Sequence, residues 1–185
     1  MELKGKKVLL RAVEESDLEM LRALTNDPEF EKMVVGWSFP VSKRDQVEWF
    51  ANCHNDAKRL RYTIVTEEDG PVGMIGLCDI DWKNGVASGL GMRIARKEIR
   101  THGLATDAWM TLMRYAFKEL RLNRINGSAL AYNAASLRVC EKVGFKVEGI
   151  QRQAVFKNGQ YNDVVMMGCL KNDYERLVAE NHYWD

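Results

Sequence analysis

The segment R-K-E-I-R-T-H-G-L-A-T-D-A, residues 96–108, decides how this chain is interpreted. Arg100, Gly103 and Ala105 form the pattern R-x-x-G-x-A, and an amphipathic helix is predicted to begin inside it. The first turn of a helix presents backbone N–H groups without intrahelical partners, together with a partial positive charge. Both stabilise a bound phosphate, and glycine lets the phosphate approach the backbone closely. The segment therefore predicts a phosphate-binding turn.

The amides expected to hold the phosphate are those of Thr101, His102, Gly103, Leu104, Ala105 and Thr106. The turn is expected to be surrounded by the positive charges of Arg93, Arg96, Lys97 and Arg100. The pattern is short, and a basic turn that only faces solvent is the alternative interpretation. The sequence contains neither G-x-x-x-x-G-K-[ST] nor G-x-G-x-x-G. A Walker-type nucleotide hydrolase and a dinucleotide-binding domain are therefore disfavoured.

The composition is that of a single domain spanning residues 1–185. Apolar residues make up 46% of the chain and charged residues 29%, enough for a sizeable core and a soluble surface. A formal net charge of +1 argues against a nonspecific nucleic-acid or membrane binder. No apolar run approaches the ~20 residues of a membrane span, and the N-terminus is not typical of a signal peptide. The scattered Cys53, Cys78, Cys140 and Cys169 predict a cytoplasmic protein without a disulfide framework or a metal site.

Hydrophobic periodicity and turn residues predict a mixed order of elements. A strand at residues 8–13 is followed by a helix capped by Ser16 with Glu19, a helical turn at 29–35 and a helix beginning at Ser42. A three-strand meander at residues 62–66, 72–80 and 87–94 precedes a long helix at 105–120. A strand at 124–130, a helix at 134–143 ending at Gly144, strands at 145–151 and 161–170, and a helical tail complete the chain. This order predicts an α+β domain with three α/β/α layers.

A second motif supports the same interpretation. N-A-A-S-L-R-V-C-E-K-V-G-F, residues 133–145, follows a predicted strand and places Asn133, Ser136 and Cys140 on one face of a helix. Together with the basic turn, this combination resembles the GNAT acetyltransferase superfamily. Within it, the segments LLRAVEESDLEML, TNDPE and GFKVEGIQRQAVFKNGQYNDVVMMGCL are similar to the branch of ribosomal-protein alanine and serine N-terminal acetyltransferases.

The resemblance implies a mostly antiparallel central sheet in which acetyl-CoA, the co-substrate, binds between two splayed strands. It implies a bulged third meander strand whose backbone at Met92, Arg93 and Ile94 pairs with the pantetheine arm. The diphosphate is then expected on residues 101–106. No metal is implied.

The resemblance also assigns roles to the helix of the second motif. Asn133 and Ser136 are expected to contact the pantetheine or to flank the reacting sulfur, and Arg138 or Lys142 to reach the nucleotide phosphates. Many family members carry a tyrosine where Cys140 stands, and that tyrosine protonates the departing sulfur. Here Ser136 is the predicted hydrogen-bond donor and Cys140 a weaker one. A buried, inert Cys140 and a Ser136 that only caps or contacts are the alternatives.

The predicted reaction is acetyl transfer to a primary amine, with a protein or peptide N-terminus as the first choice. A small amine (polyamine, amino sugar or aminoglycoside) and a noncatalytic acyl-CoA-binding sensor stay open as alternatives. Glu29, Trp37 and Phe39 are the expected acceptor-side residues; the alternative for the two aromatic residues is that they anchor their loop to the core. Glu29, Glu31 and Glu148 are candidates for a general base. Residues 180–185 either cover the acceptor groove, contact a second copy in a homodimer, or fray.

Overall fold

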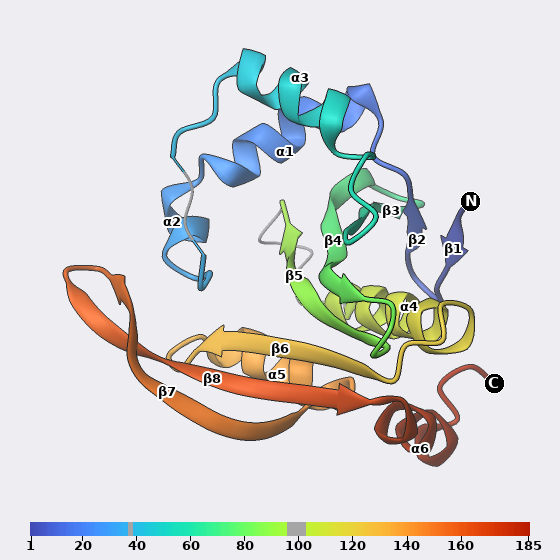
Figure 1. Ribbon diagram of the computed structural model, residues 1–185. Helices are drawn as coiled ribbons and strands as arrows, with labels where there is room; N and C mark the ends of the chain where they lie inside the picture. The colour runs from blue at the N-terminus through green and yellow to red at the C-terminus, as the bar shows by residue number, and fades with distance from the viewer. Residues whose placement is uncertain (37–38, 96–102) are drawn as a thin grey trace.

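The computed structural model describes residues 1–36, 39–95 and 103–185. Its centre is an open sheet in the order β1-β2-β3-β4-β5-β6-β8-β7 (Figure 1). The strands are β1 Leu3–Lys4, β2 Leu9–Arg11, β3 Leu60–Thr66, β4 Gly70–Asp81, β5 Val86–Ile94, β6 Arg124–Leu130, β7 Lys146–Lys157 and β8 Gln160–Leu170. Neighbouring strands are antiparallel except β5 and β6, which are parallel. The predicted α+β class with a mostly antiparallel sheet is confirmed.

Helices flank this sheet. They are α1 Leu18–Thr25, α2 Pro28–Glu31, α3 Lys43–Asn52, α4 Leu104–Lys118, α5 Ala134–Lys142 and α6 Lys171–Asn181. Helix α4 contacts β1, β2 and β4 and supplies much of the main core cluster. Leu18, Leu21 and Leu24 of α1 are also buried but do not belong to that cluster. In Figure 1 α4 lies behind the strands, whereas α1 and α3 lie above them.

The start of α1 differs from the prediction. Ser16 does not cap the helix but lies in a 3₁₀ turn, Glu15–Asp17, that precedes it. The carboxylate of Asp17 instead accepts a hydrogen bond from the amide of Glu14 (3.0 Å) and pairs with Arg11 (2.7 Å). The capping-box spacing was therefore read at the wrong residue, because a tertiary ion pair selects Asp17.

The C-terminal hairpin is longer than its hydrophobic pattern indicates. Strand β7 continues to Lys157 instead of ending near residue 151, through a register shift between Gln151 and Val155. Most β7 side chains are exposed, so the strand lacks the alternation that would reveal its length. Strand β2 covers only three of the six residues expected, and β1 was not predicted.

The last residues do not fray. Trp184 Nε1 donates to the hydroxyl of Tyr174 (2.9 Å), and the Arg114 guanidinium lies 3.8 Å from the centre of the Trp184 ring. Tyr183 donates to the carboxylate of Asp107 on α4 (2.9 Å). The tail is thus packed on α4 and α6, on the opposite side of the molecule from α2 (Figure 1). No helix among the described residues is long and apolar enough to span a bilayer.

Candidate active site

The sheet opens between β5 and β6. These strands pair over three positions only, and the last pair joins Ser88 and Asn126. Beyond it, residues 89–94 stay with β4 and residues 127–130 stay with β8. Figure 1 shows the two strands running apart from this point, which we call the fork. Within the described ranges, the edge of β5 beyond the fork has no strand partner, so its backbone groups can bind an extended ligand.

A bulge lies on β5 just beyond the fork. Leu77 pairs with Gly89 and Gly76 pairs with Gly91, so Leu90 is the extra residue of the bulge. Gly91 has a φ of +88°, a left-handed conformation that glycine adopts without a steric penalty. The predicted bulge is confirmed, and it redirects the backbone of the strand at the fork.

Two aromatic rings pack beneath the fork. A β-carbon at Gly89 would lie 2.8 Å from Cη2 of Trp109, and one at Gly127 would lie 3.0 Å from Cε1 of Phe145. The two rings contact each other edge to face, with 5.8 Å between their centroids. Both β5 and β6 carry a glycine where they part. The ring of Trp109 on α4 and the ring of Phe145, the residue before β7, can therefore pack directly against the strand backbones.

Helix α4 follows β5 in the chain and begins at Leu104. Gly103 is its N-cap residue with a φ of +78°, and its carbonyl accepts the first helical bond, from the amide of Asp107 (3.0 Å). The side chains of Leu104 and Ala105 are buried, so only their amides can contact a ligand. Thr106 is half-buried. Arg100, Thr101 and His102 lie outside the described residues, so their predicted contacts stay predictions.

The backbone of residues 92–94 is the part of β5 that can meet a ligand. The side chain of Ile94 is buried in the core, and Met92 packs against it. Arg93 donates to Thr25 Oγ1 (3.0 Å) and lies over the ring of Phe30, with 5.6 Å to its centroid. Burial lowers the pKa of Arg93. Its guanidinium therefore faces α1 and α2, so the prediction that its charge lies beside the phosphate turn is wrong, because tertiary partners hold the side chain elsewhere. Its predicted backbone contact with the coenzyme stays a prediction.

Helix α5 carries the residues of the second motif. Asn133 caps it, since Oδ1 accepts from the amide of Ser136 (3.0 Å) while Nδ2 donates to the carbonyl of Met33 (2.8 Å). Both ends of the Asn133 side chain are thus engaged within the protein, and its pantetheine contact stays a prediction. Cys140 is buried, and burial raises the pKa of its thiol to about 11, although a hydrogen bond with Ser136 opposes this rise. The thiol is therefore protonated at neutral pH.

Two cations of the same helix face solvent. Arg138 and Lys142 are exposed on α5, away from the buried Cys140. Their expected contact with the nucleotide phosphates therefore stays a prediction. The part of the chain that the structure describes contains no group of three or more His, Cys, Asp or Glu side chains placed to hold a metal ion.

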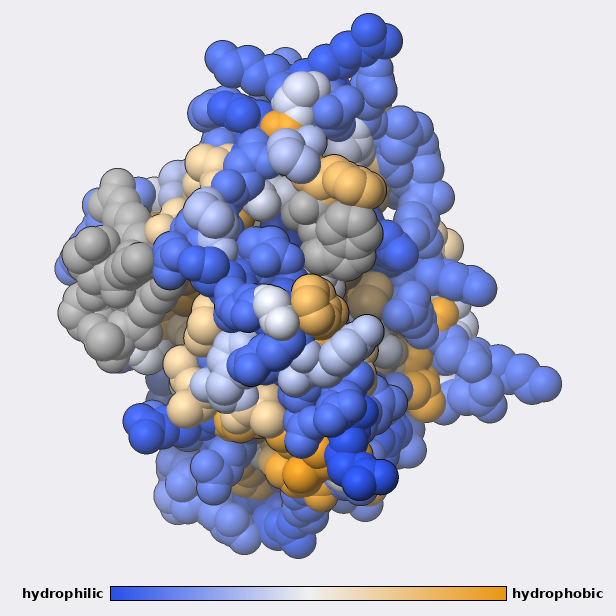
Figure 2. Space-filling view, turned by 90° about the vertical axis from the view of Figure 1, so that its left-hand side faces the viewer, coloured by the Kyte–Doolittle hydropathy of each residue, from blue (hydrophilic) through white to orange (hydrophobic). Residues whose placement is uncertain are grey.

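The acidic residues of the acceptor side are paired with cations. Glu29 forms an ion pair with Lys32 (2.7 Å), and Glu31 forms one with Lys157. Phe39 is 73% exposed, so it does not anchor its loop in the core. Trp37 lies outside the described residues. Figure 2 views the molecule from the side of α2 and the tip of the β7–β8 hairpin, where hydrophobic residues show mainly in the lower half.

Residues 31–36 connect the two halves of the molecule. The buried Lys157, at the end of β7, donates to the carbonyl oxygens of Glu31 (3.0 Å) and Gly36 (2.8 Å). Tyr132 and Asn133, next to α5, donate to the carbonyls of residues 32 and 33. The segment thus reaches from the half that contains β5 to the half that contains β6. Sequence reasoning missed Lys157 and Tyr132, because their partners lie 100 or more residues away.

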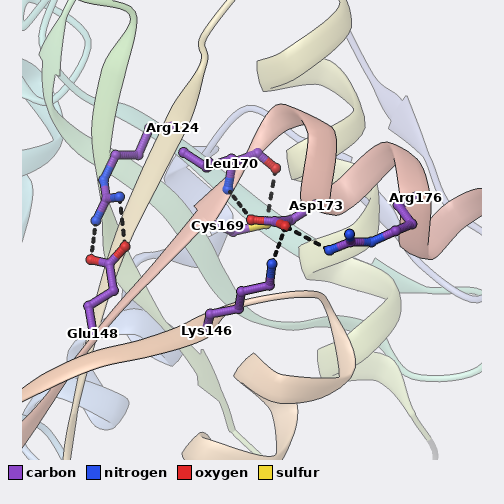
Figure 3. Close-up of polar contacts among 7 residues, drawn as sticks. All are labelled: Arg124, Lys146, Glu148, Cys169, Leu170, Asp173 and Arg176. Atoms are coloured by element: carbon purple, nitrogen blue, oxygen red, sulfur yellow. Dashed lines mark hydrogen bonds and ion pairs between the residues drawn. The ribbon is translucent and has the colours of Figure 1, made fainter.

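Glu148 lies away from the fork. It pairs with Arg124 through two hydrogen bonds, one of them 2.8 Å long, across β8 (Figure 3). A β-carbon at Gly168 would lie 2.7 Å from Glu148 Oε1, so a side chain there would displace the ion pair. The hydrogen bond from Arg124 lowers the pKa of Glu148, which makes the carboxylate a weaker base. Arg124 stands opposite Val86, where β5 and β6 are still paired, so this ion pair joins β6 to β7 at the closed end of the fork.

Comparison with known proteins agrees with this geometry. Residues 7–146 match the family model of the acetyltransferase (GNAT) domain. The SPbeta prophage-derived uncharacterized N-acetyltransferase YokL of Bacillus subtilis is 30% identical over 172 residues, which cover 92% of this chain and 94% of that protein. The putative ribosomal N-acetyltransferase YdaF of Bacillus subtilis is 40% identical over 103 residues, 56% of this chain and 55% of that protein.

The spermidine N(1)-acetyltransferase of Vibrio cholerae is 26% identical over 166 residues, 89% of this chain and 94% of that protein. A crystal structure of spermidine N-acetyltransferase from Vibrio cholerae in complex with CoA and spermine has a TM-score of 0.82 and 24% identity, covering 92% of this chain and 99% of that one. The family model and the forked sheet therefore lead to the same conclusion. The chain belongs to the GNAT acetyltransferase family and is an N-acetyltransferase that uses acetyl-CoA as its co-substrate.

Proposed function

We propose that this enzyme acetylates the α-amine of a protein or peptide N-terminus, as the branch of ribosomal-protein alanine and serine acetyltransferases does. The sequence similarity to the putative ribosomal N-acetyltransferase YdaF supports this acceptor. An α-amine has a pKa of ~7.7–8.0, so roughly a tenth of it is neutral and nucleophilic at pH 7. A lysine-like amine, with a pKa of ~10.4, is neutral less than about one time in a thousand. An α-amine therefore demands less of a general base, and no carboxylate at the fork is assigned that role.

The preference for an α-amine over a polyamine rests on the charged residues of the acceptor side. Glu29 and Glu31 are each paired with a lysine of the protein. The partly buried guanidinium of Arg93 places a positive charge between β5, α1 and α2. A polyamine site needs carboxylates directed at a polycation, and a cation in that position opposes one. An uncharged α-amine on a peptide does not meet this repulsion.

The residues at the fork fit acetyl-CoA. The amides at the start of α4 offer donors and a partial positive charge to the diphosphate, and Gly103 leaves the approach open. The bulged edge of β5 at residues 92–94 offers backbone groups to the amides of the pantetheine arm. The coenzyme so placed directs its thioester into the fork, where an amine from the acceptor side attacks the carbonyl carbon.

The leaving thiolate needs a hydrogen-bond donor or a proton. Coenzyme A is a thiol with a reference pKa near ~8.5, so it can leave as a thiolate if a donor stabilises it. Burial raises the pKa of Cys140 to about 11, which makes its thiol a poor proton source for a weaker base. A hydroxyl is the stronger hydrogen-bond donor, and Ser136 lies one turn before Cys140. Ser136 is therefore the proposed donor, and solvent supplies the proton afterwards.

The Ser136→Ala variant is expected to lower kcat by about tenfold and to change the dissociation constant of acetyl-CoA by less than about twofold. The reason is that the hydroxyl stabilises charge which appears only as the sulfur leaves. Steady-state kinetics and calorimetry measure the two effects. Cys140→Ala is the matched control and should leave kcat nearly unchanged. A large loss of kcat in Cys140→Ala would assign the donor to the cysteine, and a Ser136→Ala variant that loses only affinity would make Ser136 a contact residue.

A small amine is the second candidate acceptor. The 26% identity with a spermidine N(1)-acetyltransferase is the observation that favours it. Thiol release from acetyl-CoA, measured with peptides beginning with Ala or Ser and with spermidine, an amino sugar and an aminoglycoside, separates the candidates. We expect the peptides to give the highest kcat/KM. Faster turnover of spermidine than of the peptides would make a polyamine the acceptor in place of an α-amine. Binding of acetyl-CoA without turnover of any amine would favour a noncatalytic sensor.

A further inference from the structure

The carboxylate of Asp107 holds the N-terminal segment against α4. Asp107 lies one turn into the helix and is 1% exposed. Its Oδ2 accepts from the amides of Lys7 (2.6 Å) and Val8 (3.0 Å), and its Oδ1 accepts from the amide of Lys6 (3.1 Å). Tyr183 donates its hydroxyl to Oδ1 as well (2.9 Å). Three consecutive amides and a phenol thus converge on one buried carboxylate.

This arrangement fixes the course of residues 5–8. A buried carboxylate is costly unless it is hydrogen-bonded, and the start of a helix stabilises negative charge. Gly5 is required for the close approach, because a β-carbon there would lie 2.5 Å from both Asp107 Oδ2 and Thr111 Oγ1. The turn is closed by a bond from the amide of Gly5 to the carbonyl of Val8 (2.8 Å). The backbone of Lys7 is therefore held at one place beside the first turn of α4.

The side chain of Lys7 extends from that place to the start of α4. Its Nζ lies 3.5 Å from the position that a β-carbon would take at Gly103, the N-cap residue of α4. The side chain is exposed, so a ligand at the turn can reach it. Lys6, the neighbouring residue, points elsewhere: its Nζ lies 5.1 Å from the ring centre of Tyr183.

We propose that Lys7 is a ligand of the diphosphate of coenzyme A and that Asp107 is the positioning residue that keeps it there. This inference rests on the proposed placement of the diphosphate at the start of α4. The ammonium adds a charge-assisted hydrogen bond to the amides of the turn. Neither Lys7 nor Asp107 belongs to the R-x-x-G-x-A pattern, which spans residues 100–105. Lys7 precedes Gly103 by 96 residues in the chain. The phosphate site is thus completed by the N-terminus of the chain.

Calorimetric titration with coenzyme A tests the role of Lys7. Lys7→Met keeps the aliphatic stem and removes the charge, and it should weaken binding by about tenfold. Lys7→Arg should stay within about threefold of the unaltered enzyme, and Lys6→Met, the matched control, within about twofold. Titration with 3′-dephospho-coenzyme A should show the same loss for Lys7→Met, because the diphosphate is present in both ligands.

The following results would overturn the assignment. Unchanged affinity in Lys7→Met, or an equal loss in Lys6→Met, removes Lys7 as a specific ligand. A loss seen with coenzyme A but not with its 3′-dephospho form moves the contact to the 3′-phosphate. If the unaltered enzyme fails to bind coenzyme A, the placement of the coenzyme on α4 is refuted together with this inference. Binding by the unaltered enzyme and by Lys7→Met alike refutes the inference only.

The positioning role of Asp107 is tested by a double-mutant cycle. Asp107→Asn should raise KM for acetyl-CoA by about fivefold to tenfold while kcat at saturation stays near that of the unaltered enzyme. Since Asp107 acts through Lys7, Lys7→Met should cost less affinity in the Asp107→Asn background than in the unaltered enzyme. Tyr183→Phe removes only the phenolic bond to the same carboxylate and should leave KM almost unchanged. Additive losses in the cycle, or a fall in kcat with no rise in KM, would overturn the role of Asp107.

Discussion

The Gly103→Glu variant should bind acetyl-CoA at least about 100-fold more weakly, because it removes two or more charge-assisted contacts to the diphosphate. Gly103 has a φ of +78°, where a residue with a β-carbon loses roughly 1–2 kcal/mol. The new carboxylate also lies next to the Lys7 ammonium, 3.5 Å from the β-carbon position. It would pair with that cation and repel the phosphates. Calorimetric titration with acetyl-CoA measures the effect.

Gly159→Glu is the matched control for this variant. Gly159 has nearly the same backbone conformation, with a φ of +76°, but it lies in the turn between β7 and β8 with open space around its β-carbon position. The same glutamate there carries similar strain without facing a phosphate, so affinity should stay within about twofold. Equal losses in the two variants, or normal affinity in Gly103→Glu, would place the diphosphate away from the start of α4.

The Trp109→Ala variant should lower the free energy of unfolding by ~3–5 kcal/mol, the range for removing a large buried aromatic side chain. Trp109 is 6% exposed, packs edge to face on Phe145 and contacts the backbone at Gly89. The cavity would open beneath the point where β5 and β6 part, and the glycine there has no side chain to fill it. Urea denaturation followed by circular dichroism measures the loss.

Two further variants test whether the loss of stability in Trp109→Ala depends on the position of the ring beneath the fork or would follow the removal of any tryptophan. Trp82→Ala is the control, because Trp82 is 50% exposed and loses mainly one hydrogen bond to the carbonyl of Ala57, about 1 kcal/mol. Gly89→Ala should destabilise the unaltered protein by ~1–3 kcal/mol through its clash with the ring, and much less in the Trp109→Ala background. The ring does not support the fork if Trp109→Ala lowers the free energy of unfolding no more than Trp82→Ala does. The same conclusion holds if the losses from Gly89→Ala and Trp109→Ala simply add in the double variant.

The elements that could be predicted are those set by local chemistry. Strand β6 was predicted with its observed bounds, residues 124–130. Helix α3 begins after Ser42 as predicted, since the Ser42 hydroxyl accepts from the amide of Asp45 (3.1 Å). The turn at Gly159 and the end of α5 at Gly144 follow from the positive φ that each requires. The family pattern of residues 96–108 likewise predicted the start of α4 to within a residue.

The predictions that failed share a different cause. The capping box is formed by Glu14 and Asp17, not by Ser16 and Glu19, because Asp17 is held by Arg11 and by Thr63 on β3 (2.7 Å). Strand β7 was drawn too short because both of its faces are largely exposed and leave no pattern. In each case a partner on another element, or solvent, determines the state of the residue.

The sequence by itself determined the family and the order of the elements after β1, because these depend on residues close together in the chain. Only the tertiary structure decided where β5 and β6 part, which rings lie beneath the fork and which cations lie beside the start of α4 and beside α1 and α2. Asp107 and Lys7 are 100 residues apart, and Lys157 and Glu31 are 126 apart. Periodicity reports which face of one element is buried, but it carries no information about which side chain of another element lies against that face.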